Sequence, residues 1–108
     1  MGTNKDIFVI YTTRDHFINE ELLLRIYNDL KIHGNVFIDL LHNDSMNKQE
    51  YVIEKLYKSS SIVIIETPKL IESKWAQLEI KLAIELKKEI LGYYRPSAAI
   101  DLIKLQSI

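Results

Sequence analysis

Ser61-Ile62-Val63-Ile64-Ile65-Glu66 is a short apolar run rich in β-branched residues, and helical patterns lie on both sides of it. A continuous run of this kind, without alternating polar residues, is typical of a strand buried on both faces of a parallel sheet. Ile7-Phe8-Val9-Ile10-Tyr11 has the same character near the start of the chain. The two runs therefore predict the central strands of a parallel sheet.

Two weaker strand patterns and four helical patterns complete the element order. Val36-Phe37-Ile38 and residues 89–94 predict the other strands. Helical spacing of apolar residues follows each strand, over 18–30, after the capping pair Asn47 and Glu50, from the capping residue Ser73, and over 98–105. The resulting order, βαβαβαβα with short connections, predicts a parallel sheet with helices on both faces. With 108 residues, the chain is expected to form a single domain, 1–108.

Composition excludes several classes of function. The net charge of −1 gives no basic surface for nucleic acid, and no apolar stretch is long enough to cross a membrane. There are no cysteines, and the first residues lack the apolar core of a signal peptide, so we expect a cytoplasmic protein. Three scattered glycines rule out Gly-x-Gly-x-x-Gly and Walker-type loops, and the three histidines lack metal-ligand spacing. We therefore predict no metal and no resident cofactor.

In parallel sheets of this kind, ligands bind beyond the carboxyl ends of the strands. The polar segments expected at that edge are 11–15, 39–44, 66–68 and 93–95, together with the start of the helix that contains Trp75. On that helix, about 100° per residue places Trp75, Leu82 and Leu86 on one stripe, flanked by Leu78 and Ala83. Glu79 falls inside the same arc. Because an ionised carboxylate is costly to bury alone, Glu79 predicts a cleft, a partner or a ligand.

Several of these segments, taken in order, resemble the TIR (Toll/interleukin-1 receptor) family. Asp6–Tyr11 resembles its first box, and Gly34–Asp39 resembles its second strand, which ends in an acidic residue. Residues 52–65 match its helix, serine-containing turn and third strand, and Thr67–Trp75 is similar to its loop ending in Ser-x-Trp. The similarity covers about residues 5–94. The Pro-Gly turn common in signalling members is absent after Asp39, and the third box is absent as well.

The resemblance implies a minimal, microbial form of a flavodoxin-like, three-layer α/β sandwich, with four parallel strands in the order 2-1-3-4. It also implies cleavage of the nicotinamide–ribose bond of NAD, by a hydrolase or ADP-ribose cyclase acting in prokaryotic antiviral defence signalling. NAD or a related nucleotide would be the substrate, and self-association or contact with an effector or another TIR-containing protein is expected.

By position, the resemblance makes Glu79 the catalytic residue. A carboxylate beside the ribose stabilises an oxocarbenium-like transition state, and the cationic nicotinamide leaves without a strong acid. Trp75 is expected to pack against nicotinamide or ribose, and Arg14 to pair with the diphosphate. Tyr11 and Asp39 are expected to line the cleft, and Glu66 to orient the ribose.

Two other functions remain open at this stage. One is a non-catalytic module that self-associates through helix faces. The other is an enzyme similar to nucleoside 2-deoxyribosyltransferases, a family with a glutamate on the helix after the third strand and an alanine four residues later, as in Glu79 and Ala83. The Gly-Thr segment usual in that family is absent.

Overall fold

The computed structural model describes residues 5–96 and 106–107, which form one sheet in the order β2-β1-β3-β4-β5. Four strands are parallel: β1 (Lys5–Ile10), β2 (Gly34–Phe37), β3 (Ser61–Ile65) and β4 (Glu89–Tyr94). The predicted order 2-1-3-4 is therefore confirmed. A two-residue strand, β5 (Gln106–Ser107), pairs antiparallel with β4, which the sequence analysis did not predict. The helix predicted over 98–105 lies outside the described residues.

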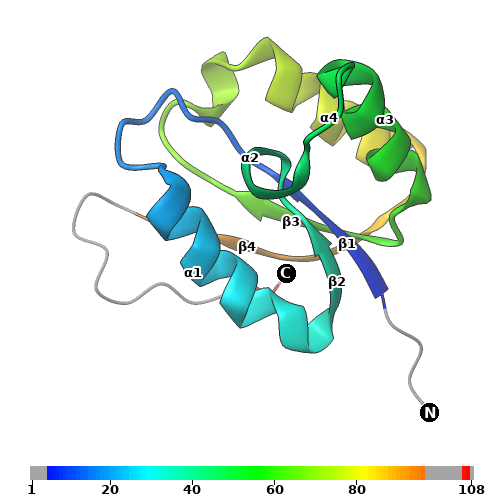
Figure 1. Cartoon of the computed structure of the whole chain (residues 1–108), viewed down its shortest axis with the longest axis horizontal. Coiled ribbons are helices and arrows are strands. Elements are labelled where there is room, and N and C mark those ends of the chain that lie inside the picture. Colours follow the sequence, from blue (N-terminus) through cyan, green and yellow to red (C-terminus); the bar gives the residue numbers. More distant parts are fainter. Residues whose placement is uncertain (1–4, 97–105, 108) are drawn as a thin grey trace.

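Helices cover both faces of this sheet, which gives the three layers of a flavodoxin-like α/β fold (Figure 1). One face carries α1 (Glu20–Leu30), and the other carries α3 (Lys48–Lys58) and α4 (Lys74–Glu85). A single helical turn, α2 (Asp39–His42), follows β2, where a loop was predicted over residues 40–46. Two 3₁₀ turns, η1 (Lys31–His33) and η2 (Leu70–Glu72), complete the connections.

The central strands are buried on both faces because successive side chains point to opposite sides of a strand. In β1, Ile7 and Val9 pack in the cluster beneath α1, whereas Phe8 and Ile10 pack in the cluster beneath α3 and α4. The uninterrupted apolar runs in the sequence thus supply two separate cores. None of the helices formed by the described residues combines the length and apolar character needed to cross a lipid bilayer.

Side-chain caps fix where the helices begin. The Ser73 hydroxyl accepts a hydrogen bond from the backbone N–H of Ala76 at 3.1 Å, and Asn47 accepts one from Glu50 at 3.3 Å. The side chain of Asn47 also donates to the Glu50 carboxylate at 2.7 Å. Both predicted caps are therefore confirmed. Such caps satisfy backbone N–H groups that the first helical turn leaves without partners.

The glycine at the start of β2 is explained by how closely its backbone approaches that of β1. Gly34 has φ 159°, and a Cβ atom placed there would lie 2.3 Å from the carbonyl oxygen of Lys5. Only glycine, which has no Cβ, lets β2 pair with β1 at this position.

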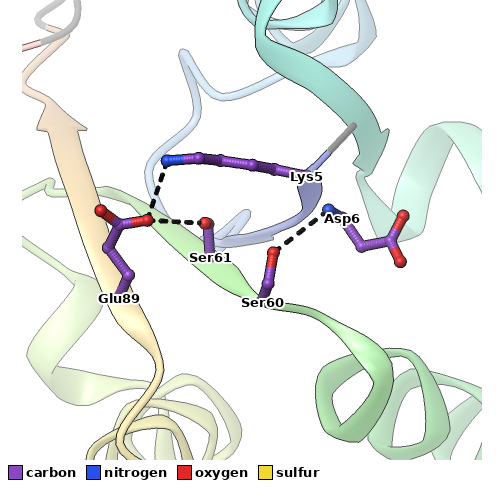
Figure 2. A network of polar contacts seen from close by, with 5 residues as sticks. All are labelled: Lys5, Asp6, Ser60, Ser61 and Glu89. Atoms are coloured by element: carbon purple, nitrogen blue, oxygen red, sulfur yellow. Dashed lines mark hydrogen bonds and ion pairs between the residues drawn. The ribbon is translucent and has the colours of Figure 1, made fainter. Parts of the chain in front are cut away.

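Polar contacts link neighbouring strands at the amino-terminal edge of the sheet (Figure 2). The Lys5 ammonium and the Ser61 hydroxyl both contact Oε1 of Glu89, at 2.9 and 3.1 Å. Beside them, the Ser60 hydroxyl accepts a hydrogen bond from the Asp6 N–H at 3.3 Å. These contacts tie β1, β3 and β4 together at the edge opposite the expected ligand site.

A second link at this end joins α3 to α4. Lys88, just after α4, donates from its ammonium group to the carbonyl oxygens of Tyr57, at 2.8 Å, and Ser59. These carbonyls lie at the carboxyl end of α3, where a cation is favoured by the helix dipole. The carboxyl ends of the two helices are therefore held by one side chain.

Candidate active site

A cavity of about 270 Å³ opens at the carboxyl edge of the parallel strands. It lies between the end of β1, the start of α2 and the first turns of α4. Its lining includes four of the six residues predicted for the site: Tyr11, Asp39, Trp75 and Glu79. Residues far apart in the sequence are thus brought together where parallel α/β folds bind ligands.

Glu79 is the buried carboxyl group of this cavity, with only 5% of its surface exposed. It lies on the face of α4 that packs toward the sheet, between Ala76 and Ala83, which are both buried. These alanines let the helix backbone approach β1 closely, so the second turn of α4 brings a carboxyl group to the end of that strand.

The orientation of α4 differs from the prediction in one respect. The predicted inward stripe contained Leu82 and Leu86, flanked by Leu78, but Leu78 is 42% exposed and Leu86 is 36% exposed. The buried face is centred on the two alanines and Glu79 instead. Hydrophobicity alone misplaces the stripe because close packing against the sheet favours small side chains over large ones.

The cavity changes the acidity of its groups. The pKa of Glu79 is raised to about 8, mainly by burial and also by the neighbouring carboxylate of Asp39, whereas a side-chain hydrogen bond with Trp75 acts in the opposite direction. Burial also raises the pKa of Tyr11 to about 12, with the charges of Asp39 and Glu79 contributing. Glu79 is therefore largely protonated at neutral pH when the cavity holds no cation.

Tyr11 and Asp39 belong to the segments that form the mouth of the cavity. The Tyr11 phenolic oxygen accepts a hydrogen bond from the backbone N–H of Leu40 at 2.8 Å. Asp39 is the first residue of α2 and accepts a hydrogen bond from the Asn43 side chain at 2.7 Å. The position of the Asp39 carboxylate is thus set by contacts within its own loop.

A smaller depression of about 180 Å³ adjoins the cavity and shares Asp39 and Trp75 with it. Its other lining residues, Lys48, Gln49 and Val52, come from the first turns of α3. The Lys48 ammonium donates to the carbonyl oxygen of Asn43 at 2.6 Å. Trp75 therefore lies between the cavity that contains Glu79 and a depression whose lining includes both Asp39 and Lys48.

Two predicted site residues lie elsewhere. Arg14 is exposed in the loop after β1 and lines neither depression, and its backbone N–H donates to the Thr12 hydroxyl at 3.2 Å. Glu66 is exposed beyond β3, where its carboxylate pairs with Arg95. Both are at the expected edge of the sheet, but their side chains are not among those that line the cavity.

Four further residues line the cavity, although no role in the site was predicted for them: Thr12, Thr13 and Leu40, which belong to the segments expected at this edge, and Ser73. Thr12 and Thr13 directly follow a buried strand, which was a usable signal. Ser73 was identified only as a helix cap. Because α4 begins at the carboxyl edge of the sheet, its capping residue also lies beside the cavity there.

Asp15 is a further buried carboxyl group near this edge. It accepts a hydrogen bond from the Lys69 N–H at 3.3 Å and so joins the loop after β1 to the loop after β3. Within residues 5–96 and 106–107, no group of three or more histidine, cysteine, aspartate or glutamate side chains is placed to hold a metal ion.

No family model matches this chain, and a search of curated proteins finds no significant match. Function must therefore be argued from the fold and the site.

Proposed function

We propose that this chain is a TIR-like enzyme that cleaves the nicotinamide–ribose bond of NAD, with Glu79 as the catalytic residue. The proposal rests on one observation above all: a buried carboxyl group lines a cavity at the carboxyl edge of a parallel sheet in the order 2-1-3-4. The resemblance of residues 5–94 to the TIR family, in which that position is catalytic, supports the same reading.

The chemistry needs few groups. The bond between the nicotinamide nitrogen and the ribose carbon breaks, and its electron pair leaves with nicotinamide and neutralises the cationic ring. The ribose becomes an oxocarbenium-like cation that the Glu79 carboxylate stabilises in a water-poor cavity. Water or an internal nucleophile then attacks that carbon and gives up its proton. A cationic nicotinamide ring in the cavity favours the ionised form of Glu79 and so offsets its raised pKa.

The two depressions suggest how the substrate is arranged. At about 270 Å³, the cavity is smaller than the roughly 300–1,000 Å³ that encloses drug-sized ligands, so it suits the nicotinamide riboside half of NAD. The adjoining depression beside Lys48 then receives the diphosphate. In this arrangement Lys48 takes the role that the sequence analysis gave to Arg14, and Trp75 contacts the ring or the ribose between them.

The test is nicotinamide release from NAD, followed by chromatography at several protein concentrations. We expect turnover by the native protein and at least about a hundredfold loss in Glu79→Gln, which keeps the shape and removes the charge. Glu85→Gln is the matched control, because Glu85 is an exposed glutamate on the same helix. Equal rates for native protein and Glu79→Gln would contradict the proposal. Base exchange between deoxynucleosides, lost in Glu79→Gln, would identify a deoxyribosyltransferase instead.

One observation favours a second candidate, a module that self-associates without catalysis. Exposed apolar side chains lie on α4 and directly after it, with Leu78 at 42%, Ile84 at 65% and Leu86 at 36% exposure. Large apolar side chains that share a surface helix often mark a contact with another protein. If the native protein forms oligomers that Leu78→Lys abolishes and shows no NAD turnover in the oligomeric state, this candidate replaces the first.

A further inference from the structure

A second cavity, of about 220 Å³, lies away from Glu79, between the edge strand β2 and α3. Its lining includes Phe37 from β2, His42 from α2, and Tyr51, Lys55 and Lys58 from α3. The proposed NAD site does not use these side chains.

Aromatic rings form one part of this cavity. The Phe37 ring is stacked on Phe8, with centroids 5.6 Å apart, and the Tyr51 ring meets Phe37 edge-on at 5.9 Å. The His42 ring is tilted against Phe37 at 6.2 Å. Because Phe37 contacts the rings of Phe8, Tyr51 and His42, its position is fixed, and the lining offers aromatic surface against which a ring can pack.

The polar groups near these rings are mainly hydrogen-bond donors. The Lys55 ammonium lies 5.5 Å from the Tyr51 ring centroid and 5.9 Å from that of Phe37, and it makes no hydrogen bond or ion pair with the described residues. His42 Nδ1 accepts a hydrogen bond from the Ile38 N–H at 2.9 Å, so in the neutral ring Nε2 carries the proton and is a donor. Lys58 is paired with Glu54 at 2.8 Å. Lys55 is thus the cation available to a ligand.

The acceptors of the cavity are already in use or lie at its other end. The Asp6 carboxylate accepts a hydrogen bond from the Asn35 side chain at 3.1 Å, next to the start of β2. A ligand beside Lys55 therefore meets donors and aromatic surface, which is the complement of a carboxylate attached to a ring.

We propose that this second cavity binds a small planar aromatic carboxylate, with the carboxylate on Lys55 and the ring against Tyr51. The charge of the lining separates this site from the first one. The Asp39 carboxylate lines the proposed NAD cavity and repels an anion there, whereas Lys55 attracts one here. The inference does not depend on the proposed activity.

The experiment uses amide chemical-shift titrations of the native protein with three probes. Benzoate has both the ring and the charge, benzamide has the ring without the charge, and cyclohexanecarboxylate has the charge without the planar ring. We expect benzoate to bind at least about tenfold more tightly than either of the others, with the largest shifts at His42, Tyr51 and Lys55.

Variants assign the contacts. Lys55→Met keeps the aliphatic stem and is expected to weaken benzoate binding about tenfold, and Tyr51→Leu is expected to remove the preference for benzoate over cyclohexanecarboxylate. Lys81→Met, an exposed position on α4, is the control and should bind as the native protein does. Thermal unfolding followed by circular dichroism establishes that each variant is folded. Equal affinities for benzoate and benzamide, shifts centred on Tyr11 and Glu79, or no saturable shifts with millimolar benzoate would each overturn the proposal.

Discussion

The phenolic oxygen of Tyr11 accepts a hydrogen bond from the backbone N–H of Leu40 at 2.8 Å. Tyr11 immediately follows β1, and Leu40 is the second residue of α2, so this bond joins two segments that are close only in the folded chain. Both residues line the candidate active site. The hydrogen bond therefore holds the first turn of α2 next to the end of β1.

Tyr11→Phe should loosen α2 with little loss of global stability. The variant keeps the ring but loses an acceptor worth about 0.5–1.5 kcal/mol, and the Leu40 N–H can turn to water. We expect the free energy of unfolding in urea to fall by roughly that amount, amide exchange in residues 39–42 to accelerate, and kcat/KM for NAD to decrease. Tyr57→Phe, at an exposed tyrosine, is the control. Unchanged amide exchange in α2 would show that the hydrogen bond does not hold this segment.

The pH dependence of kcat/KM should report on Glu79. The proposed reaction needs its carboxylate, and the pKa of this group in the empty cavity is raised to about 8. Because kcat/KM follows the ionisation of the free enzyme, it should rise with pH below about 8 and level off above it. Initial rates at low NAD concentration over this range provide the measurement. A decrease of kcat/KM through the same pH would instead mean that Glu79 acts as a proton donor.

Glu79→Gln should stabilise the fold at alkaline pH and leave it almost unchanged at acidic pH. In the native state the pKa of Glu79 is about 8, against 4.5 for an unperturbed glutamate, so the folded chain holds this proton more tightly than the unfolded chain. Stability is therefore lost as the pH rises from 4.5 to about 8, by an amount on the order of a few kcal/mol. Glutamine does not titrate and removes this loss. Urea unfolding of both proteins over this range tests it, with Glu85→Gln expected to follow the native curve.

His42 should make the fold less stable as the pH falls, which is the reverse of the effect of Glu79. Burial lowers the pKa of His42, and the nearby charge of Lys55 lowers it as well, whereas the backbone hydrogen bond from Ile38 acts in the opposite direction. The contribution is present above the unperturbed pKa of 6.5 and is lost as the pH falls through the lowered folded value. His42→Asn does not titrate and should lose less stability on acidification than the native protein. His33→Asn, at an exposed histidine, is the matched control.

The architecture could be predicted because it depends on patterns within short stretches of sequence. Strands buried on both faces, for example, appear as uninterrupted apolar runs. The apolar runs containing Ile7–Ile10 and Ile62–Ile65 could only be central strands, and the capping side chains of Asn47 and Ser73 marked helix starts by chemistry that acts within a few residues. The two-residue strand β5 carries no comparable signal, since so short a segment has no periodicity.

The site was only partly predictable. A position after a strand shows that a residue lies at the carboxyl edge of the sheet, but it does not show which way the side chain points. Tyr11 and Asp39 line the cavity, whereas Arg14 remains exposed and Glu66 pairs with Arg95. The exact face of α4 was also missed, since it depends on how closely Ala76 can approach β1, a tertiary property. Glu79 could be singled out from the sequence because an acidic residue among apolar residues on one side of a helix is unusual. That signal did not depend on placing the buried face of α4 correctly.

The link from Lys88 to the carbonyls of Tyr57 and Ser59 joins the carboxyl ends of α3 and α4. The amino-terminal turns of the same helices carry Lys48, Gln49 and Trp75, which surround the smaller depression. The link therefore lies at the ends of the two helices that are farthest from the depression. Lys88 can therefore stabilise the pairing of the two helices without taking part in the lining of the site.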